Sequence, residues 1–497
     1  MITEGTYPHQ FGGVSVWCDQ IIRGMPGYDF HLVALVGTGS EPVVWDLPGN
    51  CSLTTIPLWG IPPASPRKGQ RGGHRAGQRR VFPSRLVHRL IQALLDPPLL
   101  DPPLLDQAKL DPSTHAQSRF ADVLFELFSY AQQANLSSVL SSTRAVRLLS
   151  EAWQDRWPHA HQLMPTVHDA VTALQLIEHC LRPLSHAPVQ ADVTHVSTNG
   201  LGALPALAAK WQHDTPMVVS EHGIYLREQY LHSPSLPYRW AVKELYLGFL
   251  RQLCALAYHE AETIAPCNVY NRRWEERLGA DPARIRTVYN GVDPANFPMA
   301  DREPDKPTIS WVGRIDPIKD LETLLSAFAI VHEEMPQARL RLFGSPPKGR
   351  EPYLERCKEM VTELGIDDAV AFEGHTSKVR EAYQAGSIVA LSSVSEGFPY
   401  SLIEAMTCGR TCVATDVGGV TEAIGDTGLV VPPRNPARFA DACLTLLGDE
   451  ELRRKYAAAA RARALEFFTI DSAISKFDEI YGFLAARHPL PSVEAAQ

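Results

Sequence analysis

Two glutamates on either side of a short turn have a spacing that suits the binding of a polyhydroxylated ligand. Glu396 and Glu404 lie in the segment SEGFPYSLIEAM at 395–406. A carboxylate in a loop accepts two hydrogen bonds from vicinal hydroxyls, so Glu396 suits a sugar ring. Glu404, one turn into the helix that we expect to follow, suits the two hydroxyls of a ribose.

The turn between the glutamates supplies backbone groups that suit an anion. Its Gly-Phe-Pro sequence predicts a break before a helix, and a helix start presents N–H groups and a partial positive charge to a diphosphate. The expected ligand contacts of this turn and helix start are Gly397, Phe398, Pro399, Tyr400, Ser401 and Leu402.

A structural alternative competes for Glu404. Ser401 to Glu404 also fits a capping box, in which Glu404 reaches back to close its own helix. For this tetrapeptide alone the cap is favoured. The ligand role is favoured once Glu396, the turn and the cations upstream are considered together.

Those cations lie in VGRIDPIKD at 312–320, directly after an apolar run. Arg314 and Lys319 bracket an Asp-Pro turn, and Asp320 suits the N-cap of a following helix. A departing nucleoside diphosphate gathers negative charge, which a planar and a point cation stabilise without a metal. Either cation alone would more often be an ordinary solvated side chain.

Two candidate sites lie in the first half of the chain. Gly12 and Gly13 open a helical pattern, GGVSVW, and glycine allows a phosphate to approach a helix start closely; a plain turn explains them equally well. His222 follows the apolar run PMVVS, at the end of a strand where open α/β sheets bind ligands. His168 lacks such a context and is interpreted as structural.

The elements that must position these residues alternate between strand and helix. In the second half, buried strands are predicted at 308–313, 338–344, 369–373, 387–392 and 411–415, and helices at 320–335 and 351–364. The first half repeats the pattern, with strands near 30–36, 192–197 and 216–220 and helices near 14–24, 120–134 and 241–262. This alternation predicts two doubly wound α/β domains.

The domains expected are an N-terminal domain at 1–297, a linker at 298–307, a C-terminal domain at 308–465, a helix at 466–487 that packs back on the first domain, and a tail at 488–497. Residues 60–119 interrupt the first domain. They contain a basic run at 67–80 and a proline-rich repeat at 94–106, and we interpret them as a solvated insertion, with a contact for an acidic partner or anionic lipid as the alternative. The first strand, with only Met1 and Ile2 before TEGTYP, is shorter than expected, so either the sheet loses most of a strand or the start was assigned too late.

Composition excludes several classes of protein. The chain of 497 residues is 45% hydrophobic with a net charge of −9, which is typical of a globular protein and disfavours nucleic acid as a partner. The nine scattered cysteines indicate reduced, mostly buried thiols. No apolar run reaches membrane-spanning length and the N-terminus lacks signal-peptide features, so a cytoplasmic location is expected.

These residues resemble a known family. E396-GFPYSLI-E404 is similar to the E-x7-E signature of retaining glycosyltransferases of family 4, VGRIDPIKD to their phosphate clamp, and YNGVD at 289–293 to their interdomain segment. In the first half, TEGTYPHQFGGVSVW, DVTHVSTNGLGAL at 192–204 and SEHGIYLRE resemble the Pel-type (PelF-like) exopolysaccharide glycosyltransferases. The resemblance covers nearly the whole chain except 60–119.

The resemblance implies a GT-B fold, in which two Rossmann-like domains face each other across a cleft, and transfer of a hexose from a UDP-sugar, UDP-glucose or a related UDP-hexose, to a growing glycan. By carry-over, Arg314 and Lys319 hold the diphosphate, Glu396 the transferred sugar and Glu404 the ribose, while Gly12, Gly13 and His222 contribute from the other domain. It implies retention of configuration, no metal, no cofactor, and membrane-bound polysaccharide synthase subunits as partners at the inner face of the membrane.

Three alternatives remain open from the sequence. A phosphorylase of the same fold would bind pyridoxal phosphate through a lysine, and an epimerase would act without an acceptor. A nucleotide-sugar-binding subunit of a polysaccharide synthase would have lost catalysis, against which the intact set of Glu396, Glu404, Arg314 and Lys319 argues.

Overall fold

The chain forms two compact units. The computed structural model describes residues 1–60, 83–95, 114–158 and 164–488. Unit 1 comprises Met1–Ala265, Arg272–Arg286 and Glu479–Gln497, and unit 2 comprises Pro266–Asn271 and Thr287–Asp478. Each unit has its own sheet and its own hydrophobic core.

The sheet of unit 1 has six strands in the order β3-β2-β1-β4-β5-β6. The strands are β1 (Ile2–Glu4), β2 (Phe30–Val36), β3 (Cys51–Pro57), β4 (Thr194–Val196), β5 (Met217–Glu221) and β6 (Thr263–Pro266). Strand β1, with three residues, is as short as expected, yet it pairs in parallel with both β2 and β4 at the centre of the sheet. The strand order reverses direction between β1 and β4, which is where open α/β sheets bind ligands.

The sheet of unit 2 repeats this order as β12-β11-β10-β7-β8-β9. The strands are β7 (Thr308–Val312), β8 (Arg339–Phe343), β9 (Val370–Gly374), β10 (Ile388–Leu391), β11 (Cys412–Thr415) and β12 (Leu429–Val431), and every adjacent pair is parallel. The five strands predicted here are confirmed within a residue or two at each end. The reversal point of this sheet lies between β7 and β10.

The helices of unit 2 cover its sheet, and their apolar faces form its core with Trp311, Phe328 and Phe439 fully buried. They are α11 (Leu321–Glu334), α12 (Glu351–Glu363), α13 (Val379–Gln384), α14 (Tyr400–Thr407), α15 (Val420–Ile424), α16 (Pro436–Gly448), α17 (Glu450–Phe467) and the first part of α18 (Ile470–Arg487). Asp320 caps α11 as predicted, accepting from the backbone N–H of Thr323 at 3.3 Å.

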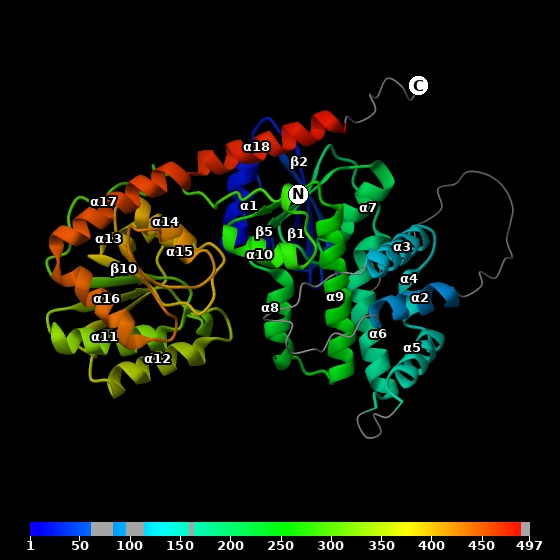
Figure 1. The fold of residues 1–497 in the computed structure, drawn as a ribbon, viewed down its shortest axis with the longest axis horizontal. Helices are drawn as coiled ribbons and strands as arrows, with labels where there is room; N and C mark the ends of the chain where they lie inside the picture. The colour runs from blue at the N-terminus through cyan, green and yellow to red at the C-terminus, as the bar shows by residue number, and fades with distance from the viewer. Residues whose placement is uncertain (61–82, 96–113, 159–163, 489–497) are drawn as a thin grey trace. The chain divides into compact units, whose positions relative to one another are not determined.

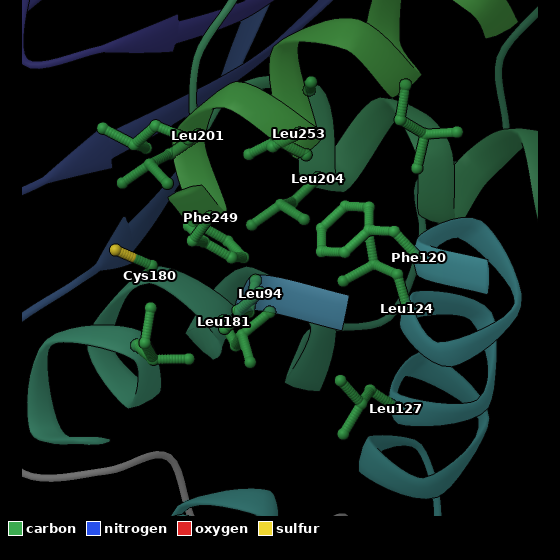
Figure 2. Packing of buried hydrophobic residues seen from close by; sticks show 14 of the residues in the cluster. Leu94, Phe120, Leu124, Leu127, Cys180, Leu181, Leu201, Leu204, Phe249 and Leu253 are labelled. Carbon is green, nitrogen blue, oxygen red and sulfur yellow. The ribbon is translucent and has the colours of Figure 1, made fainter. Parts of the chain in front are cut away.

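Unit 1 is larger because it adds a group of helices to its sheet. Its helices are α1 (Gly13–Gly24), α2 (Ser84–Leu95), α3 (Thr114–Ala131), α4 (Leu136–Leu140), α5 (Thr143–Arg156), α6 (Val167–Leu181), α7 (Ala203–His213), α8 (Tyr225–His232), α9 (Trp240–Glu260) and α10 (Val269–Arg277). Helices α2 to α6 gather beside α9 (Figure 1). Their shared core includes Phe120 of α3 and Phe249 of α9, whose ring centroids lie 6.2 Å apart (Figure 2).

The interpretation of residues 60–119 as a solvated insertion is wrong for α2. Val87, Leu90, Ile91 and Leu94 recur at helical spacing, and all four side chains are buried in the core of unit 1. Prolines follow the helix and masked this pattern in the sequence. The basic run at 67–80 and most of the repeat at 94–106 lie outside the described residues.

Replacing Leu90 by alanine is therefore expected to lower the free energy of unfolding by at least about 2 kcal/mol, because it removes buried methyl groups and leaves a cavity. His88, exposed on the same helix, provides the control substitution His88→Ala. Thermal unfolding of both variants tests this expectation. Equal stability of the two would place α2 outside the core.

Residues 298–307 pack within unit 2, whereas the sequence predicts a linker there. The backbone N–H of Ala300 donates to the carbonyl of Cys408 at 3.0 Å, and Glu303 forms an ion pair with Arg453 at 2.6 Å. The chain passes between the units at other points, next to residues 266, 272, 287 and 479. The second half of α18, from Glu479, belongs to unit 1, where the hydroxyl of Tyr481 hydrogen-bonds to Nδ1 of His195 at 2.5 Å.

Candidate functional site

The two loops that follow β7 and β10 are joined along their length. The hydroxyl of Ser392 donates to the carbonyl of Lys319 at 2.8 Å, and the backbone N–H of Val394 donates to the carbonyl of Ile318 at 2.9 Å. Both loops start at the reversal point of the unit 2 sheet. Segments that are far apart in the chain are thereby held next to each other at the carboxyl ends of β7 and β10, as the parallel-strand pattern predicts.

Lys319 and Glu396 meet at this place. Lys319 Nζ lies 2.6 Å from Glu396 Oε1, and the hydroxyl of Ser393 donates to the same oxygen at 2.5 Å. The two side chains are 17% and 11% exposed, so the pair is largely sheltered but reachable. The structure thus brings together a carboxylate and an ammonium that the sequence assigns to one site, while their roles toward a sugar and a phosphate stay predictions.

Arg314 lies exposed just after Gly313, at the start of the first loop. The loop is tied to the next strand, because the N–H of Gly313 donates to the carbonyl of Phe343 at 3.0 Å. Gly344, with φ at +146°, allows this close approach, since a Cβ there would lie 1.7 Å from the Gly313 carbonyl oxygen. The backbone that carries Arg314 is therefore fixed.

Glu404 does not form the capping box. Helix α14 begins at Tyr400 with Pro399 as its N-cap residue, so Ser401 is the second residue of the helix and no side-chain cap is present there. Glu404 Oε2 instead accepts a hydrogen bond from the hydroxyl of Tyr383 at 2.6 Å. Burial raises the pKa of Glu404 above its ordinary value, and this hydrogen bond partly offsets the rise.

One predicted backbone donor of this helix start is engaged within the protein. The N–H of Leu402 donates to the carbonyl of Pro399 at 3.2 Å and closes the first turn, because the helix begins two residues earlier than a capping box with Ser401 as N-cap would allow. This amide therefore has a partner within the protein, and its contact with a diphosphate stays a prediction.

The backbone of Gly418 and Gly419 packs closely against the backbone of the Glu396 loop. The sequence analysis did not assign this role. Gly418 has φ at +57°, and a Cβ there would lie 1.8 Å from the carbonyl oxygen of Glu396. The N–H of Gly419 donates to the carbonyl of Gly397 at 2.8 Å. Two consecutive glycines in the loop after the strand predicted at 411–415 were the signal of such a close approach.

Phe398 of the Gly-Phe-Pro turn is held by Tyr289 and Asn290, which follow the point at residue 287 where the chain enters unit 2. Its ring stacks on Tyr289 with a centroid distance of 5.2 Å, and its carbonyl accepts from Asn290 Nδ2 at 3.0 Å. Glu422 accepts from the hydroxyl of Tyr289 at 2.6 Å and from the N–H of Val269 at 2.8 Å. The YNGVD segment, predicted as interdomain, thus packs on the turn that follows Glu396.

In unit 1, Gly12 and Gly13 start α1 as predicted. The carbonyl of Gly12 accepts from the N–H of Val16 at 2.9 Å, and a Cβ at Gly12 would meet open space. The protein itself therefore does not require glycine at position 12.

His222 follows β5 as predicted and packs edge-on against the buried Trp17, with ring centroids 4.7 Å apart. Trp17 also contacts His195, with ring centroids 5.4 Å apart, and Nε2 of His195 lies 2.7 Å from the hydroxyl oxygen of Ser220. Burial holds the pKa of His195 well below its ordinary value, so this ring is neutral. His168 is exposed in the first turn of α6.

The carboxyl ends of the unit 1 strands hold buried acids that the sequence analysis missed. Glu4 accepts from the hydroxyl of Tyr225 at 2.9 Å and from the N–H of Leu201 at 2.8 Å. Glu221 accepts from the hydroxyl of Tyr258 at 2.8 Å, and burial raises the pKa of both acids. Glu275 of α10 is fully buried, and burial raises its pKa to about 8.

A cavity of about 340 Å³ in unit 1 lies away from these loops. Its lining includes Ile2, Phe30 and Thr194, the first residues of β1, β2 and β4. It therefore opens at the amino-terminal edge of the sheet, opposite the edge at which α/β sheets bind ligands. The candidate site is not this cavity.

Comparison with known families matches most of the chain. Residues 1–283 match a family model described as a domain of unknown function, DUF3492. The chain belongs to this family. Residues 306–449, which carry Lys319, Glu396 and Glu404, match a second model, described as glycosyl transferases group 1.

Parts of the DUF3492 chain are similar to named proteins of other organisms. It is 34% identical over 206 residues to a D-inositol 3-phosphate glycosyltransferase of Kribbella flavida, covering 38% of this chain and 49% of that protein. It is 32% identical over 225 residues to an exopolysaccharide phosphotransferase of Streptomyces coelicolor, covering 44% and 23%. It spans about half the length of the first of these relatives.

Solved structures show the fold of the whole DUF3492 chain. HepE of Anabaena in complex with UDP and glucose aligns with a TM-score of 0.57 at 15% identity, over 97% of this chain and 99% of that one. Sucrose-phosphate synthase of Thermosynechococcus elongatus aligns with a TM-score of 0.60 at 18% identity, over 98% and 99%. The predicted α/β fold of GT-B type, with two Rossmann-like sheets, is confirmed.

The structure also bears on the cysteines and on membrane-spanning helices. All nine cysteines lie among the described residues as free thiols, eight of them buried, as predicted. Within the described ranges, no helix combines the length and apolar character that crossing a bilayer requires.

Proposed function

We propose that this chain is a retaining, metal-independent hexosyltransferase that transfers a hexose from a UDP-sugar, with UDP-glucose favoured, to a glycan acceptor of an exopolysaccharide. The observation that carries the proposal is the Lys319–Glu396 pair, 2.6 Å apart at the reversal point of the unit 2 sheet. It lies inside the segment that matches glycosyl transferases group 1.

The donor would be held by residues of unit 2 with distinct roles. Lys319 and Arg314 bind the diphosphate, and Glu396 accepts hydroxyl groups of the transferred sugar. Tyr383 holds Glu404 Oε2 and thereby orients Oε1 toward the ribose hydroxyls. When donor binds, the Lys319 ammonium is shared between Glu396 and the phosphate oxygens.

The same cations would assist departure of the nucleoside diphosphate. Breaking the glycosidic bond places negative charge on the leaving oxygen, and Lys319 and Arg314 stabilise that charge in place of a metal ion. The diphosphate itself would take the acceptor proton, so that no protein nucleophile is needed. The resemblance to family 4 supports retention, and the UDP and glucose bound to HepE support the donor class.

The biological setting that we propose follows the resemblance to Pel-type enzymes. The protein would act in the cytoplasm, at the inner face of the membrane, beside membrane-bound synthase subunits. The similarity to an exopolysaccharide phosphotransferase agrees with a role in polysaccharide assembly.

A donor screen tests the proposal. Calorimetry with UDP-, GDP- and ADP-sugars is expected to show binding of a UDP-hexose, and radiolabelled donor is expected to hydrolyse slowly in excess EDTA. Binding of GDP- or ADP-sugars alone would overturn the donor assignment. Complete loss of turnover in EDTA, restored by magnesium or manganese, would overturn the metal-free mechanism.

Glu404→Gln is expected to lower UDP-sugar affinity about fivefold or more, because a charged acceptor bonded to ribose hydroxyls is stronger than a neutral one by roughly 1 kcal/mol. The unfolding temperature should change little, since the amide oxygen still accepts from Tyr383. Exposed Glu381 on α13 provides the control Glu381→Gln. Donor affinity equal to wild type in Glu404→Gln would refute the ribose assignment.

A further inference from the structure

Two consecutive serines follow β10, and each bonds to one residue of the Lys319–Glu396 pair. The hydroxyl of Ser392 donates to the backbone carbonyl of Lys319 at 2.8 Å, and the hydroxyl of Ser393 donates to Glu396 Oε1 at 2.5 Å. Both serines are 0% exposed. Ser392 therefore fixes the backbone that carries the ammonium, whereas Ser393 acts on the carboxylate itself.

The backbone of Ser393 is in turn held by the neighbouring strand β11. The hydroxyl of Thr415, the last residue of β11, donates to the carbonyl of Ser393 at 2.6 Å. Thr415 is fully buried as well, so water does not compete for this bond. Two hydrogen bonds therefore connect the sheet of unit 2, by way of Ser393, to the carboxylate of Glu396.

Ser393 and Lys319 bond to the same oxygen of Glu396. Lys319 Nζ lies 2.6 Å from Oε1, which is also the atom that accepts from the Ser393 hydroxyl. A carboxylate oxygen accepts two hydrogen bonds, so these two donors occupy the capacity of Oε1. Hydroxyl groups of a ligand would therefore bind to Oε2, the other oxygen of this carboxylate.

We propose that Ser393 is a positioning residue, which holds Oε1 of Glu396 so that Oε2 accepts hydroxyl groups of the transferred hexose. This inference rests on the proposed function and adds a residue to it. In the proposed mechanism, the Lys319 ammonium is shared with the phosphate oxygens once the donor binds. The Ser393 hydroxyl is neutral and is not drawn to the phosphates, so it keeps the carboxylate in place when the ammonium turns toward them.

A purely structural role of Ser393 is the competing explanation. Ser393 lies three residues before Glu396, and serine hydroxyls often close local turns of this length. The loop is already fixed on both sides of Glu396, however, since the N–H of Val394 and the carbonyl of Gly397 bond to neighbouring loops at 2.9 and 2.8 Å. The two roles differ in one measurable respect, because only the positioning role depends on the presence of the hexose.

Calorimetry of the full-length protein with UDP-glucose, and with UDP, which lacks the hexose, separates the two roles. Ser393→Ala is expected to weaken UDP-glucose binding about tenfold, as loss of a hydrogen bond to a charged group does, and to change UDP binding less than about twofold. Ser326→Ala is the control, because it removes a half-buried serine hydroxyl that bonds to a backbone carbonyl within α11. Equal weakening of both ligands by Ser393→Ala would assign a structural role and overturn the inference.

Two further variants extend the test. Thr415→Val removes the hydroxyl that holds the Ser393 carbonyl, so it should also weaken UDP-glucose binding more than UDP binding. In a Glu396→Ala protein, adding Ser393→Ala should cause no further loss of UDP-glucose affinity, because the carboxylate that Ser393 positions is gone. A further tenfold loss in that protein, or wild-type UDP-glucose affinity of Ser393→Ala, would overturn the inference. Failure of the wild type to bind any UDP-sugar would instead refute the proposed function, on which this role rests.

Discussion

Lys319→Ala is expected to reduce kcat by about 100- to 1000-fold, since loss of one preorganised group that stabilises charge in the transition state has an effect of this size. The ammonium lies 2.6 Å from Glu396 and, in the proposed mechanism, beside the leaving diphosphate. Lys378→Ala, at an exposed position before α13, controls for the loss of a positive charge elsewhere in unit 2. Steady-state turnover of UDP-glucose, with hydrolysis as the readout, measures the effect.

A purely structural role of Lys319 and a leaving-group role predict different activities for a double variant. If Lys319 only neutralises Glu396, removing both charges should restore the activity of Glu396→Gln alone. If Lys319 stabilises the leaving group, Lys319→Ala/Glu396→Gln should remain at least about 100-fold below Glu396→Gln. Activity of the double variant equal to that of Glu396→Gln would therefore exclude the leaving-group role.

The meeting of Lys319 and Glu396 could be predicted from the sequence because it follows from strand order. Both residues lie in loops that follow apolar runs, and in a parallel sheet all such loops emerge at one edge. The location of Glu404 on the helix that follows the Glu396 turn was equally predictable. Its partner Tyr383 was not, because a tyrosine in a helix between strands has no local pattern that indicates its contact.

Unit 1 was harder to predict because its elements are short or irregular. Strand β3, CSLTTIP, is only partly buried and lacks a continuous apolar run, and β6, TIAP, has four residues including a proline. Helix α2 was hidden because it runs directly into a proline repeat. Its apolar stripe, with Leu90 and Leu94 one turn apart, is the local pattern that indicates the helix.

Buried acids are the features least accessible from sequence. Glu275 lies in a segment, NRRWEERLGA, that reads as a solvated helix, and only tertiary packing decides that its carboxyl is fully buried. Neither of its carboxylate oxygens has a hydrogen-bond partner among the described residues. A buried ion without partners is costly, so the group retains its proton.

Glu275→Gln is expected to make unit 1 more stable than the wild type, by a difference that grows as the pH rises. Burial raises the pKa of Glu275 from 4.5 to about 8, while Arg272 lowers it and Glu276 raises it further. The folded state therefore binds this proton more tightly than the unfolded state does. Between pH 4.5 and about 8 the wild type loses stability with rising pH, by roughly 1.4 kcal/mol per pH unit, and above that range the loss is complete.

Glutamine does not titrate, so the difference between Glu275→Gln and wild type should grow from pH 5 to pH 8 and then level off. Burial raises the pKa of Glu221 and the charge of Glu275 raises it further, so the difference between the two proteins reports the loss of Glu275 together with its effect on Glu221. Glu276→Gln, at an exposed neighbouring position, should show no such growth. Thermal unfolding from pH 5 to 9 measures all three proteins. A constant difference across this range would mean that Glu275 is ionised in the folded protein.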